Sequence, residues 1–436
     1  MSQSITIKFL SAIEILDSRG NPTLSAQVGF SNGTIGTAAV PSGASTGKHE
    51  AFELRDASDA RYLGKGVIQA VNNINLNIQE HFTGTMWNNF EEFDSELISL
   101  DTSGNKSKLG ANAILAVSLA AAHAFASNDS NSELWEYLSS HTGLTPSLPV
   151  PMLNILNGGS HASNSTDVQE FMVIPAGFND FSSALRAGVE IYHNLKTILS
   201  SKNHNLNVGD EGGFAPQLTS NEEAIELIIN AIEKSGYKPG EDVFLGLDVA
   251  ASELYDSQID CYKLKRQGIN VTSEELIALY SNWVDKFPII SIEDGLHEDD
   301  WAGWTNLTQK LGKKIQLVGD DLLVTNIDRI NQANLNMACN AILLKPNQIG
   351  SLTETYQAYS LAKEYDWNSV MSHRSGETED TTIADLAVGW GIGQIKTGAP
   401  ARSDRVAKYN RLLKIEKQLG NDAIFNGKKV FNKLKL

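Results

Sequence analysis

The chain has 436 residues, 41% of them hydrophobic and 20% charged, which is typical of a soluble globular protein of one or two domains. Its formal net charge of −17 argues against direct binding to nucleic acids or anionic membranes, because both need clustered Lys and Arg. The two cysteines, Cys261 and Cys339, lie far apart in the sequence, so neither a disulfide framework nor a zinc site is expected.

The first twenty residues contain no basic segment followed by a continuous apolar one, so we expect no secretory signal there. The most apolar run, residues 111–126, is short for a membrane span and contains Asn112, Ser118 and His123. It predicts an Ala-rich buried helix instead. With the cysteine usage, these features predict a cytoplasmic protein, and a secondary cell-surface or secreted presence stays open.

The first part of the chain predicts strands followed by helices. Residues 23–30 alternate apolar and polar side chains, as a half-buried strand does. A turn follows, and residues 34–40 are expected to run back beside this strand. Residues 41–50, "PSGASTGKHE", predict a flexible Gly/Ser/Thr loop, and its first part, "PSGASTG", is typical of a lid. Helical patterns run from about residue 66 to residue 141, and three prolines in "TGLTPSLPVP" then indicate a boundary. We expect an N-terminal α+β capping domain at 1–142 and a catalytic domain at 143–436.

Beyond the boundary, strand and helix patterns alternate. Residues 272–288 begin with a capping box, Thr272 and Glu275, and stop at Pro288, where the buried strand pattern "IISIEDG" follows. Such alternation predicts a parallel sheet covered by helices, and so many units in under three hundred residues favour a closed barrel. The predicted fold class is therefore α/β, with a C-terminal TIM-type β/α barrel and a smaller N-terminal α+β domain.

Six consecutive strand patterns end in groups that can ionise or bind phosphate. In chain order these are Asp248, Glu293, Asp320, Lys345, the triplet His373–Arg374–Ser375, and Lys396. The carboxyl ends of the strands of a β/α barrel meet at one mouth, where active sites lie. The pattern therefore predicts a charged site at that mouth.

Three of these groups are carboxylates: Asp248, Glu293 and Asp320. Their mutual repulsion is costly without a cation, and an all-oxygen set suits Mg²⁺ that keeps positions open for substrate. The alternative is that each carboxylate only caps the N-terminus of a helix, and all three would then have to be caps at once.

Lys345 and Lys396 would face this cation, which makes the ammonium form less stable and each lysine a candidate base. For Lys396, a salt bridge to a metal-binding carboxylate is a strong alternative. Glu211 lies in the Gly-rich segment 207–216 and is a candidate acid if enclosed there, although a turn Glu is commonly just exposed.

Arg374 and Ser375 offer a guanidinium and a hydroxyl, which together suit a phosphate. Pairing of Arg374 with Glu377 or Asp380 on the surface, and a core position for His373, are the alternatives. In the lid segment, Ser42 could supply oxygens to a second Mg²⁺. A phosphate-binding loop there is the other reading, but the Gly-Lys-Ser/Thr ending of a P-loop is missing.

The chain as a whole resembles the enolase family, most closely the bacterial form. The resemblance rests on ten motifs in order: "EILDSRGNPT", "PSGASTG", "GANAILAVSLA", "VPMLNILNGGSHA", "QEFM", "GDEGGFAP", "LLKPNQIGSLTET", "SHRSGETEDT", "IKTGAP" and "RVAKYNRLL". It implies a Mg²⁺-dependent glycolytic hydro-lyase, phosphopyruvate hydratase, which interconverts 2-phosphoglycerate and phosphoenolpyruvate. Two Mg²⁺ ions per site and a homo-oligomer, at least a dimer, are also implied; the choice between dimer and octamer stays open.

The resemblance also implies residue roles. Lys345 would remove the C2 proton, and Glu211 would protonate the leaving C3 hydroxyl. Asp248, Glu293 and Asp320 would hold the first Mg²⁺, and Ser42 would contribute to the second. The implied substrate-binding residues are His161, Gln169, Glu170, His373, Arg374, Ser375 and Lys396. The segment "HASNST" departs from the family pattern after His161, which bears on lid closure rather than on reaction type.

Two rival functions remain at this point. Another enolase-superfamily reaction, such as racemisation of a carboxylate, would use Lys345 and Lys396 as two bases but would give Glu211 and the Arg374–Ser375 pair no role. A non-catalytic surface-binding role would be favoured by a missing metal ligand or base, and every expected position is filled.

Overall fold

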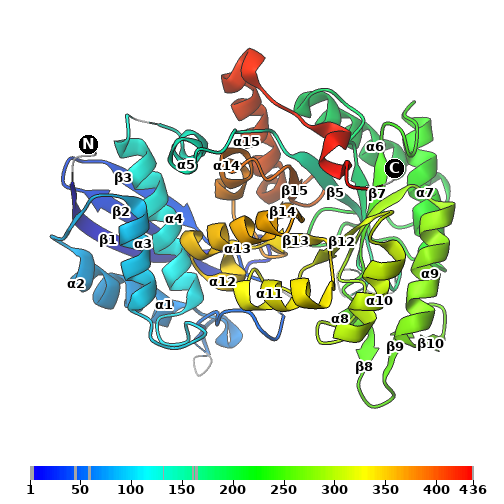
Figure 1. Cartoon of the computed structure of the whole chain (residues 1–436), viewed down its shortest axis with the longest axis horizontal. Coiled ribbons are helices and arrows are strands. Elements are labelled where there is room, and N and C mark those ends of the chain that lie inside the picture. Colours follow the sequence, from blue (N-terminus) through cyan, green and yellow to red (C-terminus); the bar gives the residue numbers. More distant parts are fainter. Residues whose placement is uncertain are drawn as a thin grey trace.

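The computed structural model describes residues 4–43, 47–56, 60–130, 132–159, 162 and 165–434. The chain forms a four-stranded sheet with helices in its first third and a closed eight-stranded barrel surrounded by helices in the remainder (Figure 1). The expected α/β fold with a TIM-type barrel is confirmed.

The N-terminal sheet is antiparallel, with strand order β3-β2-β1-β4. Its strands are β1 (Ile5–Leu16), β2 (Pro22–Phe30), β3 (Ile35–Ala39) and β4 (Met86–Trp87). The alternation that predicted β2 is confirmed, because its four apolar side chains from Leu24 to Phe30 are all buried. A short loop joins β2 to β3, as expected.

Helices pack on this sheet and beside it. They are α1 (Ile68–Asn72), α2 (Gln79–Phe82), α3 (Phe90–Ser99), α4 (Ala111–Asn128) and α5 (Leu134–Thr142), with a π-helical segment at Asn73–Ile78 between α1 and α2. By length and composition alone, α4 could cross a membrane, but 83% of it is buried inside the protein. It is the Ala-rich core helix that the sequence predicts, and it lies against β2 and β3.

The barrel strands follow the ring order β11-β12-β13-β14-β15-β5-β6-β7. They are β5 (Val150–Asn157), β6 (Glu170–Ile174), β7 (Phe244–Asp248), β11 (Ile289–Glu293), β12 (Gln316–Gly319), β13 (Ala341–Leu344), β14 (Asn368–Ser372) and β15 (Gln394–Lys396). The outer helices are α6 (Phe181–Ser201), α7 (Asn221–Lys234), α9 (Ser273–Lys286), α10 (Trp301–Leu311), α11 (Ile327–Asn336), α13 (Leu352–Glu364), α14 (Thr382–Gly389) and α15 (Ser403–Leu419). The capping box predicted at Thr272 and Glu275 opens α9.

The expectation of a wholly parallel barrel sheet is wrong for β6, which runs antiparallel to both of its neighbours, β5 and β7. The physical reason is that the described residues between β5 and β6 form no crossover helix, so the chain returns in the opposite direction; α6 and α7 then both connect β6 to β7. As a result Glu170, the first residue of β6, pairs in register with Asp248, the last residue of β7.

Short elements complete the fold. They are α8 (Ala251–Leu254), α12 (Pro346–Ile349), the small sheet of β8 (Tyr255–Asp256), β9 (Cys261–Leu264) and β10 (Ile269–Val271), and 3₁₀ turns at Arg61–Gly64, Gly420–Asp422 and Gly427–Phe431. The barrel interior is packed with apolar side chains from its strands, and Phe431 of the C-terminal segment belongs to the same cluster. The barrel is therefore filled, and chemistry is confined to its mouth.

Candidate active site

The mouth of the barrel collects nearly all of the site residues predicted from the sequence. Asp248, Glu293 and Lys396 are the last residues of β7, β11 and β15, while Asp320, Lys345 and His373 directly follow β12, β13 and β14. One pocket is lined by Gln169, Glu170, Glu211, Asp248, Asp320, Lys345, Ser372, His373, Arg374, Ser375 and Lys396. The long-range placement expected from the strand ends is thus seen in the structure.

Lys396 lies among three carboxylates. Its Nζ is 2.8 Å from Asp248 Oδ2, 2.8 Å from Glu293 Oε1 and 3.3 Å from Glu170 Oε2. Burial alone would lower the pKa of Lys396, but these carboxylates raise it well above its ordinary value. The lysine is therefore held as an ammonium ion, which matches the salt-bridge interpretation rather than that of a base.

The same carboxylates leave capacity for a metal ion. Glu293 is 1% exposed, and no described residue donates a hydrogen bond to its Oε2 atom. Burial, and after it the charge of Asp248, raises the pKa of Glu293. Since β7, β11 and β12 are neighbours in the ring, Asp248, Glu293 and Asp320 come from adjacent strands. Buried, mutually repelling oxygens with an unsatisfied acceptor fit a hard divalent cation.

A second acidic group overlaps this set. Among the described residues, carboxylate oxygens of Asp294, Asp320 and Asp321 lie within 4.8 Å of one another. Both Asp294 oxygens, however, accept backbone N–H groups, from Asp320 and Asp321, each at 2.8 Å. Asp294 therefore orients the end of β12, and Asp320 is the member common to both groups.

Lys345 contacts Asp320 through its ammonium group. Burial alone would lower the pKa of Lys345, but the negative charge of Asp320, together with that of Glu293, raises it. The sequence-based expectation concerned Lys345 beside a bound cation, so it stays a prediction. Gln348, which the sequence analysis missed, donates to Asp320 Oδ1 at 2.8 Å.

Glu211 is enclosed rather than exposed, with 3% of its surface accessible. Its Oε2 accepts a hydrogen bond from Asn154 Nδ2 at 3.0 Å and lies 3.4 Å from His373 Nε2. Burial, and after it the charge of Glu211, raises the pKa of Glu170 well above its ordinary value. Two neighbouring buried carboxyl groups of this kind share a proton.

The cationic corner at 373–375 is buried, and its ion pair was not anticipated. Arg374 binds neither Glu377 nor Asp380 through its guanidinium; Nη1 and Nη2 lie 2.9 and 3.2 Å from the two oxygens of Glu50. Glu377 instead accepts the backbone N–H of Arg374 at 3.1 Å. Glu50 is the last residue of the loop predicted at 41–50, and that position was the available clue to its role.

Ser42 is fully buried beside this corner. Its hydroxyl donates to Asp17 Oδ2 at 2.9 Å and accepts from Arg19 at 3.2 Å, while Arg19 also donates to Ser375 Oγ at 3.4 Å. Among the described contacts, Ser42 has no hydrogen bond to the acidic residues at the ends of β7, β11 and β12. Its contribution to a second Mg²⁺ stays a prediction. His161 lies outside the described residues.

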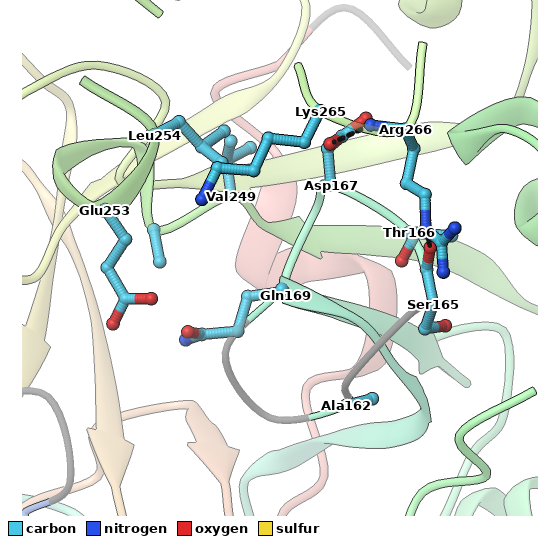
Figure 2. Close-up of a pocket in the computed structure, with 12 residues that line it drawn as sticks. Ala162, Ser165, Thr166, Asp167, Gln169, Val249, Glu253, Leu254, Lys265 and Arg266 are labelled. Carbon is cyan, nitrogen blue, oxygen red and sulfur yellow. Dashed lines mark hydrogen bonds between the residues drawn. The ribbon is translucent and has the colours of Figure 1, made fainter. Parts of the chain in front are cut away.

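A cavity of about 390 Å³ adjoins the pocket, and Gln169 lines both. Figure 2 shows the side chains of Gln169, Glu253 and Lys265 pointing into it. At its edge the Asp167 carboxylate accepts the backbone N–H of Arg266 at 2.9 Å, so the small sheet is tied to the segment before β6. The cavity therefore offers space beside Gln169, one of the predicted substrate-binding residues.

Comparison with protein families gives a consistent result for both parts of the chain. Residues 7–138 match the enolase N-terminal domain, and residues 145–434 match the enolase C-terminal TIM barrel domain. Together the two matches span nearly the whole chain and include each described site residue. The chain belongs to the enolase family.

Proposed function

We propose that the protein is a Mg²⁺-dependent hydro-lyase that interconverts 2-phosphoglycerate and phosphoenolpyruvate. Family membership supports a lyase-type, metal-binding enzyme. One observation carries the finer proposal. Lys345 follows β13, and Glu170 begins β6, four places away in the ring of eight, so a basic and an acidic group approach the pocket from opposite sides.

The proposed chemistry is anti elimination of water. Lys345, once deprotonated, takes the C2 proton, and the Glu170–Glu211 pair gives its shared proton to the departing C3 hydroxyl. Arg374 and Ser375 hold the phosphate, and Lys396 faces the substrate carboxylate. Lys396, already held as an ammonium ion, counters the negative charge that develops there.

Asp248, Glu293 and Asp320 would hold the metal ion. A bound Mg²⁺ supplies Lewis-acid stabilisation of the substrate carboxylate as negative charge builds on it. A cation held by Asp320 would also offset the negative charge that raises the pKa of Lys345 in the structure. The proposed enzyme is also cytoplasmic, homo-oligomeric and of the bacterial form. Ser42 would contribute to a second Mg²⁺, and His161 would bind the substrate.

A racemase of the same superfamily is the second candidate, but a specific observation disfavours it. That reading needs Lys396 as a second base, whereas Lys396 lies within 3.3 Å of three carboxylates that favour its ammonium form.

The test is the ultraviolet absorbance of phosphoenolpyruvate formed from 2-phosphoglycerate and Mg²⁺. We expect a rise that chelation abolishes and that Lys345→Ala lowers by at least about 10²-fold. Lys314→Ala, which changes an exposed lysine paired with Asp285, is the matched control and should keep full activity. Absence of a rise with folded, metal-loaded protein would overturn the proposal.

A further inference from the structure

Arg405 is a fully buried arginine near the start of α15 that none of the steps above uses. Its Nη1 lies 2.5 Å from His373 Nδ1 and 2.5 Å from the carbonyl oxygen of Arg374. Its Nη2 donates to the carbonyl oxygens of Ser375 at 2.5 Å and Asp210 at 3.2 Å. One guanidinium thus joins the His373 corner to the loop that carries Glu211.

The contact with His373 determines where that ring carries its proton. A guanidinium has five N–H donors and no acceptor, so His373 Nδ1 must present a lone pair to Arg405. The proton of a neutral ring then lies on Nε2, which is the nitrogen 3.4 Å from Glu211 Oε2. Burial, together with Arg405, lowers the pKa of His373 to about 4, so the ring is neutral at neutral pH.

We propose that Arg405 is a positioning residue that fixes His373 in the Nε2–H tautomer and directs this N–H toward Glu211. Asn154 Nδ2 donates to Glu211 Oε2, so His373 Nε2 and Asn154 Nδ2 lie beside the same oxygen. The acidic proton of Glu211 is thereby kept off Oε2 and placed on Oε1. This last step rests on the proposed function, in which Glu211 is part of the acid.

A purely structural role for Arg405 makes a different prediction, and α15 provides a matched control. Lys408, one turn further along, is also fully buried and donates to Glu377 Oε2 and to the carbonyl oxygen of Thr378. It binds the same loop as Arg405, but its hydrogen bonds do not reach His373. Loss of Lys408 therefore tests loop anchoring without altering the ring contact.

The test is ¹⁵N NMR of the imidazole nitrogens in histidine-labelled protein, where a His373→Gln variant identifies the His373 signals among nine histidines. Wild type should show a protonated Nε2 and an unprotonated Nδ1. Arg405→Met should lose this preference, whereas Arg405→Lys and Lys408→Met should keep it. The readout needs no substrate, so it can fail or succeed independently of the proposed reaction.

Measurement of kcat tests whether the position of this proton affects catalysis. Arg405→Met should lower kcat by about 10²-fold, within the ~10²–10⁴-fold that a positioned proton donor contributes, and Arg405→Lys should restore part of it. A protonated Nδ1 of His373 in wild type would overturn the inference even if neither Arg405 variant folds. So would an unchanged tautomer in Arg405→Met, or an equal tautomer shift in Lys408→Met.

Discussion

At the scale of single residues, the mouth of the barrel is a set of buried charges that each have a specific partner. Arg374 and Glu50 show this most clearly, because their side chains are 3% and 8% exposed and meet in a two-point contact. Asn347 also accepts from Arg374 at 3.0 Å. A buried pair of this kind is costly to break, because the remaining charge loses its partner.

The first prediction concerns this pair. Glu50→Gln should lower the free energy of unfolding by about 3 kcal/mol, measured by urea denaturation, because it leaves the Arg374 charge without its carboxylate. Asp285→Asn removes one partner of the Lys314 pair, whose side chains are more than half exposed, and should cost less than about 1 kcal/mol. Equal effects of the two variants would show that burial of the Glu50 pair contributes nothing.

The second prediction concerns His373 and pH. Burial lowers its pKa from 6.5 to about 4, so between these values the unfolded chain binds a proton that the folded protein does not. Stability therefore falls as pH falls through this window. Relative to His373→Gln, the wild type should lose about 3 kcal/mol of unfolding free energy between pH 7 and pH 4. A difference between the two proteins that is constant with pH would contradict this assignment.

At the scale of elements, close packing of α4 on the N-terminal sheet depends on small residues. Gly36 of β3 has no side chain, and a Cβ placed there would lie 2.0 Å from the carbonyl oxygen of Ala120 and 2.3 Å from the nitrogen of Ala124. Both obstacles are backbone atoms of α4, which cannot rotate away. The alanines of α4 thus let the helix approach the sheet, and Gly36 sets the distance.

The third prediction follows from this contact. Gly36→Ala should lower the free energy of unfolding by about 1–3 kcal/mol, since α4 must shift to admit a methyl group. Gly104→Ala is the matched control, because nothing lies within 4 Å of a Cβ at that position, and it should change stability by about 0.5 kcal/mol or less. Denaturant titration of both variants would decide, and an unaffected Gly36→Ala would disprove the tight contact.

At the scale of the whole molecule, a chain with net charge −17 buries several carboxylates at one site. Burial, and after it neighbouring acidic groups, raises the pKa of Glu293 and Asp294, and raises that of Asp321 to about 8. Lys345 and Lys396 offset only part of this repulsion. Binding of a divalent cation by the folded state alone should therefore stabilise the entire protein.

The fourth prediction is a rise in melting temperature with Mg²⁺. At 100 times its dissociation constant the ion should add about 2.7 kcal/mol, which corresponds to a shift of a few degrees, and chelation should reverse it. Asp320→Asn should remove most of the shift, while Asp285→Asn should leave it intact. A shift of equal size in both variants would place the ion elsewhere.

Patterns that depend on neighbours in the sequence were predictable. The capping box at Thr272 starts α9, and the alternation from Leu24 to Phe30 forms β2, because short-range spacing decides which face is apolar. The charged strand ends were equally predictable, since barrel strands meet at one mouth. The reversed direction of β6 was not, because its apolar run looks the same in either direction.

The sequence by itself therefore determined the fold class, the Ala-rich core helix and the set of charged residues that reach the mouth of the barrel. Only the tertiary structure decided how those charges are paired: Lys396 among three carboxylates, Arg374 on Glu50, Glu170 beside Asp248, and Arg405 on His373. The physical reason is one of range. Periodicity and caps act within a few residues, whereas each of these pairs joins segments separated by at least thirty residues, and burial sets the strength of each pair.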